Sequence, residues 1–289
     1  MSITDVSDPP VRRSRPALSP SRANDFKQCP LLYRFRAIDR IPERSTTAQV
    51  KGTVVHAALE ALYAIPSSKR DCDSAVELIE PAWDKVITES PQLAELISGK
   101  ELATLLEQAR SLVTGYYEME DPTRFDPESC EQRVEIELAD GTPLRGFIDR
   151  IDVASNGMLR VVDYKTGKSP REFTEAKALF QMKFYALVVM RMRGVVPAQL
   201  QLMYLADKQS LTYKPDEGEL VRFERMLSAI WRAILAAGES GDFRPKRGKL
   251  CNWCDHQALC PEFGGTPPAY PGWPTTVDSA NLLVSESAS

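Results

Sequence analysis

The sequence lacks a continuous apolar run of about 18 residues, which a membrane-spanning helix needs. Its opening residues, MSITDVSDPPVRRSRP, also lack the apolar stretch that follows the basic residues of a secretory signal peptide. Both absences predict a cytoplasmic protein without membrane partners. In that compartment, the six cysteines are expected to bind a metal or serve redox chemistry rather than form disulfides.

A nucleotide-binding phosphate loop is missing as well. Residues 166–169 (TGKS) resemble the end of the P-loop pattern G-x-x-x-x-G-K-[ST], but that pattern requires glycine at position 162, where this chain has Val162. Without that glycine, the backbone N–H groups cannot curl around a phosphate. Helicase motifs are also absent, so unwinding of a nucleic acid would need a separate helicase.

The small net charge of −4 conceals a strong asymmetry. Residues 12–44 hold nine Arg or Lys against three acids, whereas residues 71–140 hold eighteen acids against five bases. A second basic run spans residues 244–249. Such runs are often solvated surfaces, but clustered cations also form the electrostatic footprint of proteins that bind phosphates. The candidate nucleic-acid contacts are Arg34, Arg36, Lys246, Arg247 and Lys249.

Composition divides the chain into one folded domain and two tails. Residues 1–18 and 264–289 are rich in proline and small polar residues, and both are predicted to be disordered. Ser19-Pro20 is a helix start signal that opens the domain, which extends to residue 263.

The predicted elements within 19–263 indicate an α/β fold. Helical spacing of apolar residues comes first, then a period of two with Asp140-Gly141 and Asn156-Gly157 as hairpin turns. Helices are expected near 46–64, 73–89, 100–120, 174–193 and 217–237. Strands are expected near 132–138, 143–153, 158–165, 198–206 and 210–214.

Charged residues interrupt the apolar faces of two neighbouring strands. Asp163 and Lys165 continue the face of Val161, and Asp149 shares a face with Ile151, because residues two apart on a strand point the same way. A structural ion pair at a strand end would explain one of these carboxylates. Two buried carboxylates are costly without a compensating cation, so together they favour a functional site.

This set suits metal-assisted phosphodiester hydrolysis. Two carboxylates can hold Mg²⁺ or Mn²⁺, which polarises a phosphate and lowers the pKa of a bound water. A lysine can orient or activate the attacking water and offset the charge that builds on the phosphate. Asp149 and Asp163 are therefore the candidate metal ligands, and Lys165 is the candidate catalytic lysine.

Several motifs in this order resemble a known family. The segments GTVVHAALE (52–60), GFIDRID (146–152), VVDYKTGK (161–168) and QMKFYAL (181–187) are similar to the nuclease domain of RecB and AddB in the PD-(D/E)xK superfamily. The resemblance covers about residues 19–263. It implies a restriction-endonuclease-like core, in which helices flank a central mixed β-sheet.

The resemblance also implies roles for further residues. His56 would be a metal ligand, although an isolated helical histidine is more often structural. Gln181 and Tyr185 match a Q-x-x-x-Y motif; they share one helix face and can meet the same DNA strand, with helix packing as the alternative for Tyr185. Glu135 would be an additional acid, although its strand face favours a solvated glutamate.

The third region of interest is LCNWCDHQALCPEF (250–263), which contains Cys251, Cys254 and Cys260. Three thiolates at this spacing indicate a metal site. The candidates for a fourth ligand are His256, Cys72, Cys130 and Cys29. In AddB-type nucleases one N-terminal and three C-terminal cysteines hold a [4Fe–4S] cluster. The resemblance therefore implies a cluster on Cys29, Cys251, Cys254 and Cys260 that clamps the two ends of the domain, with a Cys₃His zinc site as the alternative.

Such a cluster would join the two basic runs into one groove for a phosphate backbone, with Tyr33, Phe35 and Trp253 as candidate stacking surfaces. The sequence thus predicts an Mg²⁺- or Mn²⁺-dependent DNA nuclease with a role in repair or recombination, an exonuclease acting on single strands or ends. The alternatives are a non-catalytic nucleic-acid-binding module and a zinc-binding structural protein.

Overall fold

The computed structural model describes residues 16–169 and 175–274. The chain forms two compact units. One unit comprises residues 43–229, and the other combines the described residues before 43 with those from 230 onward. Among the described residues, no helix has both the length and the apolar character needed to cross a bilayer.

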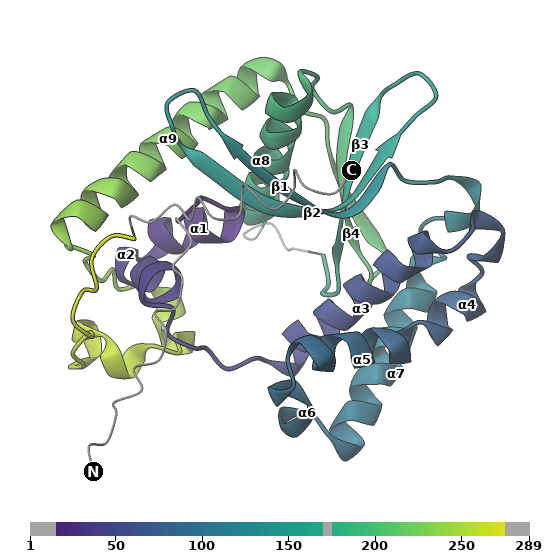
Figure 1. Cartoon of the computed structure of the whole chain (residues 1–289), viewed down its shortest axis with the longest axis horizontal. Coiled ribbons are helices and arrows are strands. Elements are labelled where there is room, and N and C mark those ends of the chain that lie inside the picture. Colours follow the sequence, from purple (N-terminus) through teal and green to yellow (C-terminus); the bar gives the residue numbers. More distant parts are fainter. Residues whose placement is uncertain (1–15, 170–174, 275–289) are drawn as a thin grey trace, which may run out of the picture. The chain divides into compact units, whose positions relative to one another are not determined.

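The unit of residues 43–229 is built on one five-stranded sheet with the strand order β1-β2-β3-β4-β5 (Figure 1). Only β3 and β4 are parallel, and the other neighbours are antiparallel. The predicted mixed sheet is confirmed. The strands are β1 (Ser129–Glu137), β2 (Pro143–Val153), β3 (Leu159–Lys165), β4 (Gln199–Tyr204) and β5 (Gln209–Tyr213).

The first two hairpins turn where the sequence predicts. Gly141 has φ +83° and Gly157 has φ +81°, a left-handed conformation that glycine adopts without a steric penalty. The first turn places Glu137 opposite Pro143 and thereby sets the register of β1 on β2. That register determines which side chains of the two strands meet further along the hairpin.

A helix connects the parallel strands, as such a pair requires. This helix, α8 (Glu175–Arg193), lies on the side of the sheet to which Asp163 points, because its Gln181 side chain reaches that carboxylate. The next residue of β3, Tyr164, points the other way into an apolar core. Helices therefore cover both sides of β3, in agreement with the predicted architecture.

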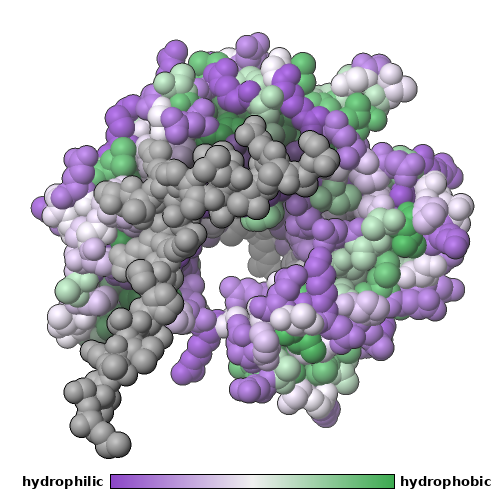
Figure 2. All heavy atoms as spheres, viewed as in Figure 1, coloured by the Kyte–Doolittle hydropathy of each residue, from purple (hydrophilic) through white to green (hydrophobic). Residues whose placement is uncertain are grey.

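The core on the Tyr164 side of the sheet is formed by the helices that precede it in the chain. Apolar residues of these helices pack on Val162, Tyr164 and Met203 of β3 and β4. The helices are α3 (Thr47–Ala64), α4 (Cys72–Glu77), α5 (Ile79–Glu89), α6 (Gln92–Leu96) and α7 (Gly99–Tyr116). Hydrophilic side chains predominate on their visible surface, where much of the acidic stretch 71–140 lies (Figure 2).

One predicted helix of this group differs from the structure. The helix expected over 73–89 is divided at Leu78, which ends α4 and precedes α5. Pro81 lies in the first turn of α5, where its missing N–H costs nothing, whereas in an uninterrupted helix it would remove a hydrogen bond. The short helix α6 was not predicted.

The second unit contains α1 (Pro20–Gln28), α2 (Pro30–Tyr33), a π-helical turn over Arg34–Asp39 and the end of α9 (Glu217–Ser240). The start of α1 agrees with the sequence signal, because the Ser19 side chain accepts a hydrogen bond from the Arg22 N–H and Pro20 follows it. Three short 3₁₀ turns follow α9, over Lys249–Trp253, Gln257–Leu259 and Pro261–Phe263.

The boundaries predicted for the tails are wrong where the structure describes them. Leu18 is completely buried. The Tyr270 hydroxyl donates a hydrogen bond of 2.7 Å to the Gly238 carbonyl, and the Trp273 ring packs on Trp231 with centroids 6.0 Å apart. Aromatic residues thus hold 264–274 on the second unit despite the proline-rich composition. Residues 1–15 and 275–289 lie outside the described part of the chain.

Candidate active site

Asp163 and Lys165 form a pair at the end of β3, as the sequence predicts. The Lys165 Nζ lies 2.5 Å from Asp163 Oδ2, and Gln181 Nε2 donates a hydrogen bond of 2.6 Å to Asp163 Oδ1. Only 7% of Asp163 is exposed. One oxygen of this buried carboxylate thus accepts a hydrogen bond and the other forms an ion pair, which together fix its orientation.

Asp149 of β2 is the second buried carboxylate, and the main chain of β3 holds it. Its Oδ2 accepts a hydrogen bond of 2.7 Å from the Tyr164 N–H. The pairing of β2 with β3 begins only at Arg150 and Val162. The Tyr164 N–H therefore lies beyond the paired part of the two strands, and the Asp149 side chain accepts its hydrogen bond. The structure thus brings Asp149 and Asp163 to the same point of the sheet.

His56 reaches this point from α3. Its Nε2 lies 2.9 Å from the Tyr164 carbonyl oxygen, and its Nδ1 lies 3.5 Å from Asp149 Oδ2 and 3.4 Å from Glu131 Oε1. One ligand atom each from His56, Glu131 and Asp149 lies within 4.8 Å of the other two. The histidine predicted from the resemblance is therefore part of the group.

Glu131 is the member of the group that the sequence did not identify. It has φ +45°, an uncommon and strained conformation for a residue other than glycine. The register of β1 on β2 places it opposite Asp149, yet the ladder skips this pair and joins Cys130 to Arg150 and Gln132 to Ile148. The strand is thus distorted at the residue that turns its carboxylate toward His56.

Glu135, the acid expected from the resemblance, lies elsewhere. Its two carboxylate oxygens pair with Arg133 Nη2 at 2.7 Å and with Arg145 Nη2 at 2.6 Å, on the exposed side of the β1–β2 hairpin. Because it is four residues from Glu131 along β1, it cannot join the group around His56. The structure therefore does not bring Glu135 to the other predicted site residues, and Glu131 lies beside His56 instead.

The surroundings shift the pKa values of the group. Burial and the neighbouring Asp163 charge raise the pKa of Asp149 to about 7, against the opposing effects of His56 and the Tyr164 N–H. Burial alone lowers the pKa of His56, but the hydrogen bond that its ring donates to Glu131 and the charges of the two aspartates raise it to about 9. Three carboxylates and two cations leave the site one negative charge in excess when all are ionised.

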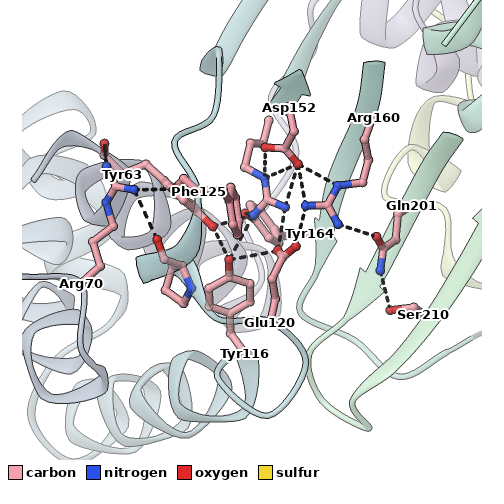
Figure 3. Close-up of polar contacts among 12 residues, drawn as sticks. Tyr63, Arg70, Tyr116, Glu120, Phe125, Asp152, Arg160, Tyr164, Gln201 and Ser210 are labelled. Atoms are coloured by element: carbon pink, nitrogen blue, oxygen red, sulfur yellow. Dashed lines mark hydrogen bonds and ion pairs between the residues drawn. The ribbon is translucent and has the colours of Figure 1, made fainter. Parts of the chain in front are cut away.

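The side chain of Tyr164 anchors the site to a buried polar network (Figure 3). Arg150, with no exposed surface, donates hydrogen bonds to the hydroxyls of Tyr164 at 2.6 Å, Tyr63 at 2.7 Å and Tyr116 at 3.0 Å. Its charge is balanced by Glu120 at 2.6 Å and by Asp152. Because Tyr164 contributes an N–H and a carbonyl to the site, this network supports the backbone that positions Asp149 and His56.

Tyr185 of α8 closes the other side of the site. It interacts with Gln181 and with the main-chain N–H of Phe147, and burial raises its pKa further above the ordinary value. Its ring occupies the space that a side chain at Gly146 would need, since a Cβ there would lie 2.9 Å from the ring. Helix packing, the alternative considered for Tyr185, accounts for much of its environment.

The donor set fits a hard divalent cation. Carboxylate oxygens, one imidazole and a main-chain carbonyl are ligands that Mg²⁺ and Mn²⁺ accept, and His56, Glu131, Asp149 and the Tyr164 carbonyl supply them in one place. Asp163 lies beside this set and holds Lys165. The arrangement can therefore bind a cation next to a positioned lysine ammonium group.

The second unit contains a cavity of about 190 Å³, which four cysteines line together with Leu32 and residues of the 245–263 segment. These cysteines are Cys29, Cys251, Cys254 and Cys260. Main-chain N–H groups point at their sulfur atoms, from Lys246 to Cys29 at 3.4 Å and from Gly248 to Cys251 at 3.2 Å. The chain ends thus meet at the four thiols that the resemblance implies.

The other candidate ligands do not line this cavity. His256 is buried and packs on the Phe35 ring at a centroid distance of 5.2 Å, while Cys72 and Cys130 belong to the unit of residues 43–229. The cavity also exceeds the roughly 30 Å³ that one water molecule occupies in the liquid. The four cysteines thus line this space, whereas His256, the fourth ligand of the alternative Cys₃His zinc site, does not.

The basic residues divide into two groups. Lys246, Arg247 and Lys249 line the cysteine cavity and are exposed or half-buried, so they remain candidates for phosphate contacts. Arg34 is buried, 3.0 Å from Asp39 and 2.5 Å from the Pro268 carbonyl oxygen, so its assignment to a nucleic-acid surface is wrong. Arg36 pairs with Asp25 at 2.6 Å.

The aromatic residues predicted near the cysteines also differ in their exposure to solvent. Tyr33 and Phe35 are buried, so they pack in the interior and cannot stack on a base. Trp253, by contrast, is 76% exposed between Cys251 and Cys254. Among these three, only Trp253 is available to a ligand.

Three comparisons with known proteins agree with this geometry. Residues 17–261 match the family model of the PD-(D/E)XK nuclease superfamily. The chain is 27% identical to the Gene 69 protein of Mycobacterium phage L5 over 288 residues, and 26% identical to the Gene 69 protein of Mycobacterium phage D29 over 273 residues. Each match covers 86% of this chain and 97% of the relative.

The fold is also similar to a crystal structure from Eubacterium rectale that carries the name "Putative exonuclease". The TM-score is 0.57 at 17% sequence identity, and the match covers 83% of this chain and 87% of that one.

Proposed function

Since this chain belongs to the PD-(D/E)XK nuclease superfamily, we propose that it is an Mg²⁺- or Mn²⁺-dependent deoxyribonuclease of the RecB and AddB type. Its proposed substrate is DNA with single strands or ends, which it degrades as an exonuclease in repair or recombination. A separate helicase would supply any unwinding. The observation that carries the proposal is the convergence of Asp149, Asp163, Lys165 and His56 at one point of the sheet.

The residues of the candidate active site would have different roles in hydrolysis. His56, Glu131, Asp149 and the Tyr164 carbonyl would hold the divalent cation, which polarises the scissile phosphate and acidifies a water. Lys165 is positioned by its ion pair with Asp163 and would orient the attacking water toward the phosphate. Asp163 thus fixes the lysine next to the residues that would hold the cation, and Gln181 fixes Asp163 in turn.

We also propose that the cysteine cavity holds a [4Fe–4S] cluster on Cys29, Cys251, Cys254 and Cys260. The four thiols around one cavity and the N–H groups that point at their sulfurs support this proposal, because such hydrogen bonds are typical of iron–sulfur ligands. The cluster would join the two chain ends within this unit. Lys246, Arg247 and Lys249 would then offer their charges to a DNA backbone.

The decisive test is to incubate end-labelled single- and double-stranded DNA with the purified protein in Mg²⁺, Mn²⁺ or EDTA and to size the products. Cleavage is expected with either metal and not with EDTA. Asp163→Ala and Lys165→Ala are expected to abolish cleavage while the fold and DNA binding persist. Lys100→Ala, an exposed lysine on α7, is the matched control and should cleave normally. Full activity of either active-site variant would overturn the mechanism.

A further inference from the structure

Phe147 is an exposed aromatic residue on the strand that carries Asp149. Its exposed fraction is 53%, whereas its neighbours Gly146 and Ile148 are buried. A single exposed apolar side chain is ordinary on a protein surface, so the neighbours of this ring decide whether it has a role. The β1–β2 hairpin thus presents one large aromatic ring to solvent two residues before a candidate metal ligand.

Two arginines are neighbours of Phe147 in the sheet. Arg133 lies directly opposite Phe147 on β1, and Arg145 precedes it by two residues on β2. Glu135 holds both guanidinium groups, at 2.7 Å and 2.6 Å. These four residues, Arg133, Glu135, Arg145 and Phe147, are called the hairpin platform below. With two cations and one anion, the platform carries one net positive charge around an apolar ring.

The platform is tied to the active site by its backbone. The Phe147 N–H interacts with the Tyr185 oxygen, and the tyrosine ring fills the space beside Gly146. Asp149 follows Phe147 by two residues, which places their Cα atoms about 7 Å apart along the strand. The ring therefore has a fixed backbone close to the point where a phosphodiester bond would be cleaved.

From these observations we infer that Phe147 is a binding site for a nucleobase of the substrate strand, flanked by phosphate contacts from Arg133 and Arg145. This inference rests on the proposed nuclease function and adds the recognition of a single strand. Nucleobases stack on aromatic rings whatever their sequence, and a guanidinium can pair with a phosphate through two hydrogen bonds. In duplex DNA both faces of each base are already stacked, so the platform selects unpaired nucleotides.

Glu135 has a definite part in this arrangement. By pairing with both arginines it holds their guanidinium groups together on the hairpin that carries the ring, and its exposure leaves it free to release them to a phosphate. Surface ion pairs of this kind are weak, so a phosphate can replace the carboxylate at little cost. The acid that does not belong to the catalytic group thus organises the surface beside it.

The first test measures binding rather than cleavage, so that it is independent of the mechanism. Phe147→Ala, Phe147→Trp and the control Met158→Ala, an equally exposed apolar side chain in the turn before β3, would be made in the inactive Lys165→Ala protein. Fluorescence anisotropy would give the Kd for labelled single-stranded and duplex oligonucleotides. Phe147→Ala should weaken single-strand binding about tenfold and leave duplex binding unchanged. Phe147→Trp and Met158→Ala should bind as the parent does.

Several outcomes would overturn the inference. Unchanged single-strand affinity in Phe147→Ala would exclude stacking, and an equal loss for both oligonucleotides would assign the ring to general surface packing. A change in oligomeric state on gel filtration would show that a second copy covers the ring. Melting curves of the variants separate each result from unfolding. If Phe147→Ala behaves as predicted but the native protein cleaves nothing, the site stands and the proposed nuclease function fails.

The arginines allow a second measurement. For single strands, each phosphate contact contributes about 0.7 to the slope of log affinity against log salt. Arg133→Ala and Arg145→Ala should each reduce this slope by about that amount for the single-stranded oligonucleotide. Lys100→Ala on α7 should leave it unchanged. Unaltered slopes in both arginine variants would remove the phosphate contacts from the proposal.

Discussion

The guanidinium of Arg150 donates a hydrogen bond of 2.6 Å to the hydroxyl of Tyr164, whose own main chain holds the candidate active site. Removing only that hydroxyl, in Tyr164→Phe, should allow the β3 backbone to shift and weaken Mn²⁺ binding about tenfold, as other changes behind metal ligands do. Isothermal titration calorimetry would measure the affinity.

Tyr116→Phe is the matched control for this prediction. It removes a hydroxyl from the same network, but Tyr116 is on α7 and contributes no main-chain group to the site. Both variants should lose roughly 1–3 kcal/mol of stability, because each removes a buried hydrogen bond to the charged Arg150 guanidinium. Equal Mn²⁺ affinity in the two variants would show that the network stabilises the fold without positioning the site.

Glu131 combines an unfavourable backbone conformation with a candidate ligand role, and two substitutions separate these properties. Glu131→Gly removes both the carboxylate and the strain, whereas Glu131→Gln keeps the strain. Both should weaken metal binding. The glycine variant should be the more stable by about 1 kcal/mol in urea unfolding, since left-handed φ penalises residues with a Cβ. A glycine variant less stable than the glutamine variant would contradict this account.

Stability of the metal-free protein should depend on pH through His56. The folded-state pKa of about 9 lies above the ordinary value of 6.5, so its contribution is complete below pH 6.5 and is lost as the pH rises through 9. The pKa of Asp149 is also raised, from 3.8 to about 7, so it lowers stability as the pH rises between these values, and this loss is complete and constant above neutral pH.

Urea unfolding in EDTA between pH 7 and 9.5 would therefore report mainly on His56. The free energy of unfolding should fall over this range in the native protein and fall less in His56→Ala. Identical slopes in the two proteins would show that the imidazole is not held as a cation by Glu131 and Asp149. Because a metal ligand must lose this proton, Mg²⁺ affinity should rise over the same pH range.

The cysteine proposal predicts a coloured protein. Anaerobic purification should give a brown sample with broad absorption near ~400 nm and about four irons per chain. Cys29→Ala should lose the absorption as completely as Cys254→Ala, because both line the same cavity. Cys72→Ala is the control and should retain it. A colourless protein with one zinc and a dispensable Cys29 would refute the cluster and leave the nuclease proposal intact.

The sequence predicted the strands of the sheet and much of the site because both depend on short-range patterns. The period of two identified Asp149, Asp163 and Lys165, and the Q-x-x-x-Y spacing identified Gln181, which contacts Asp163. Glu131 was missed because the strand was expected to begin at 132. The register from the Asp140-Gly141 turn places residue 131 opposite 149 and could have revealed it.

Other features could not be predicted because they depend on contacts between distant parts of the chain. The phenols around Arg150 come from residues 63, 116 and 164, which no local pattern connects. Arg34 lies in a basic run that looks solvent-exposed in the sequence, but its partner is a carbonyl 234 positions away. Charge runs show how many cations there are, and only tertiary packing decides which of them face solvent.

The cysteine cavity has a consequence for biosynthesis. Cys29 leaves the ribosome early, but its companions at 251, 254 and 260 are translated more than 200 residues later, after the whole sheet. Domains generally fold as units during synthesis, so residues 43–229 can fold first. The N-terminal segment can complete its own unit only after the residues from 230 onward have been made. Any metal centre on these four thiols would therefore be assembled last. A chain that ends before residue 251 could fold its sheet but could never load that centre.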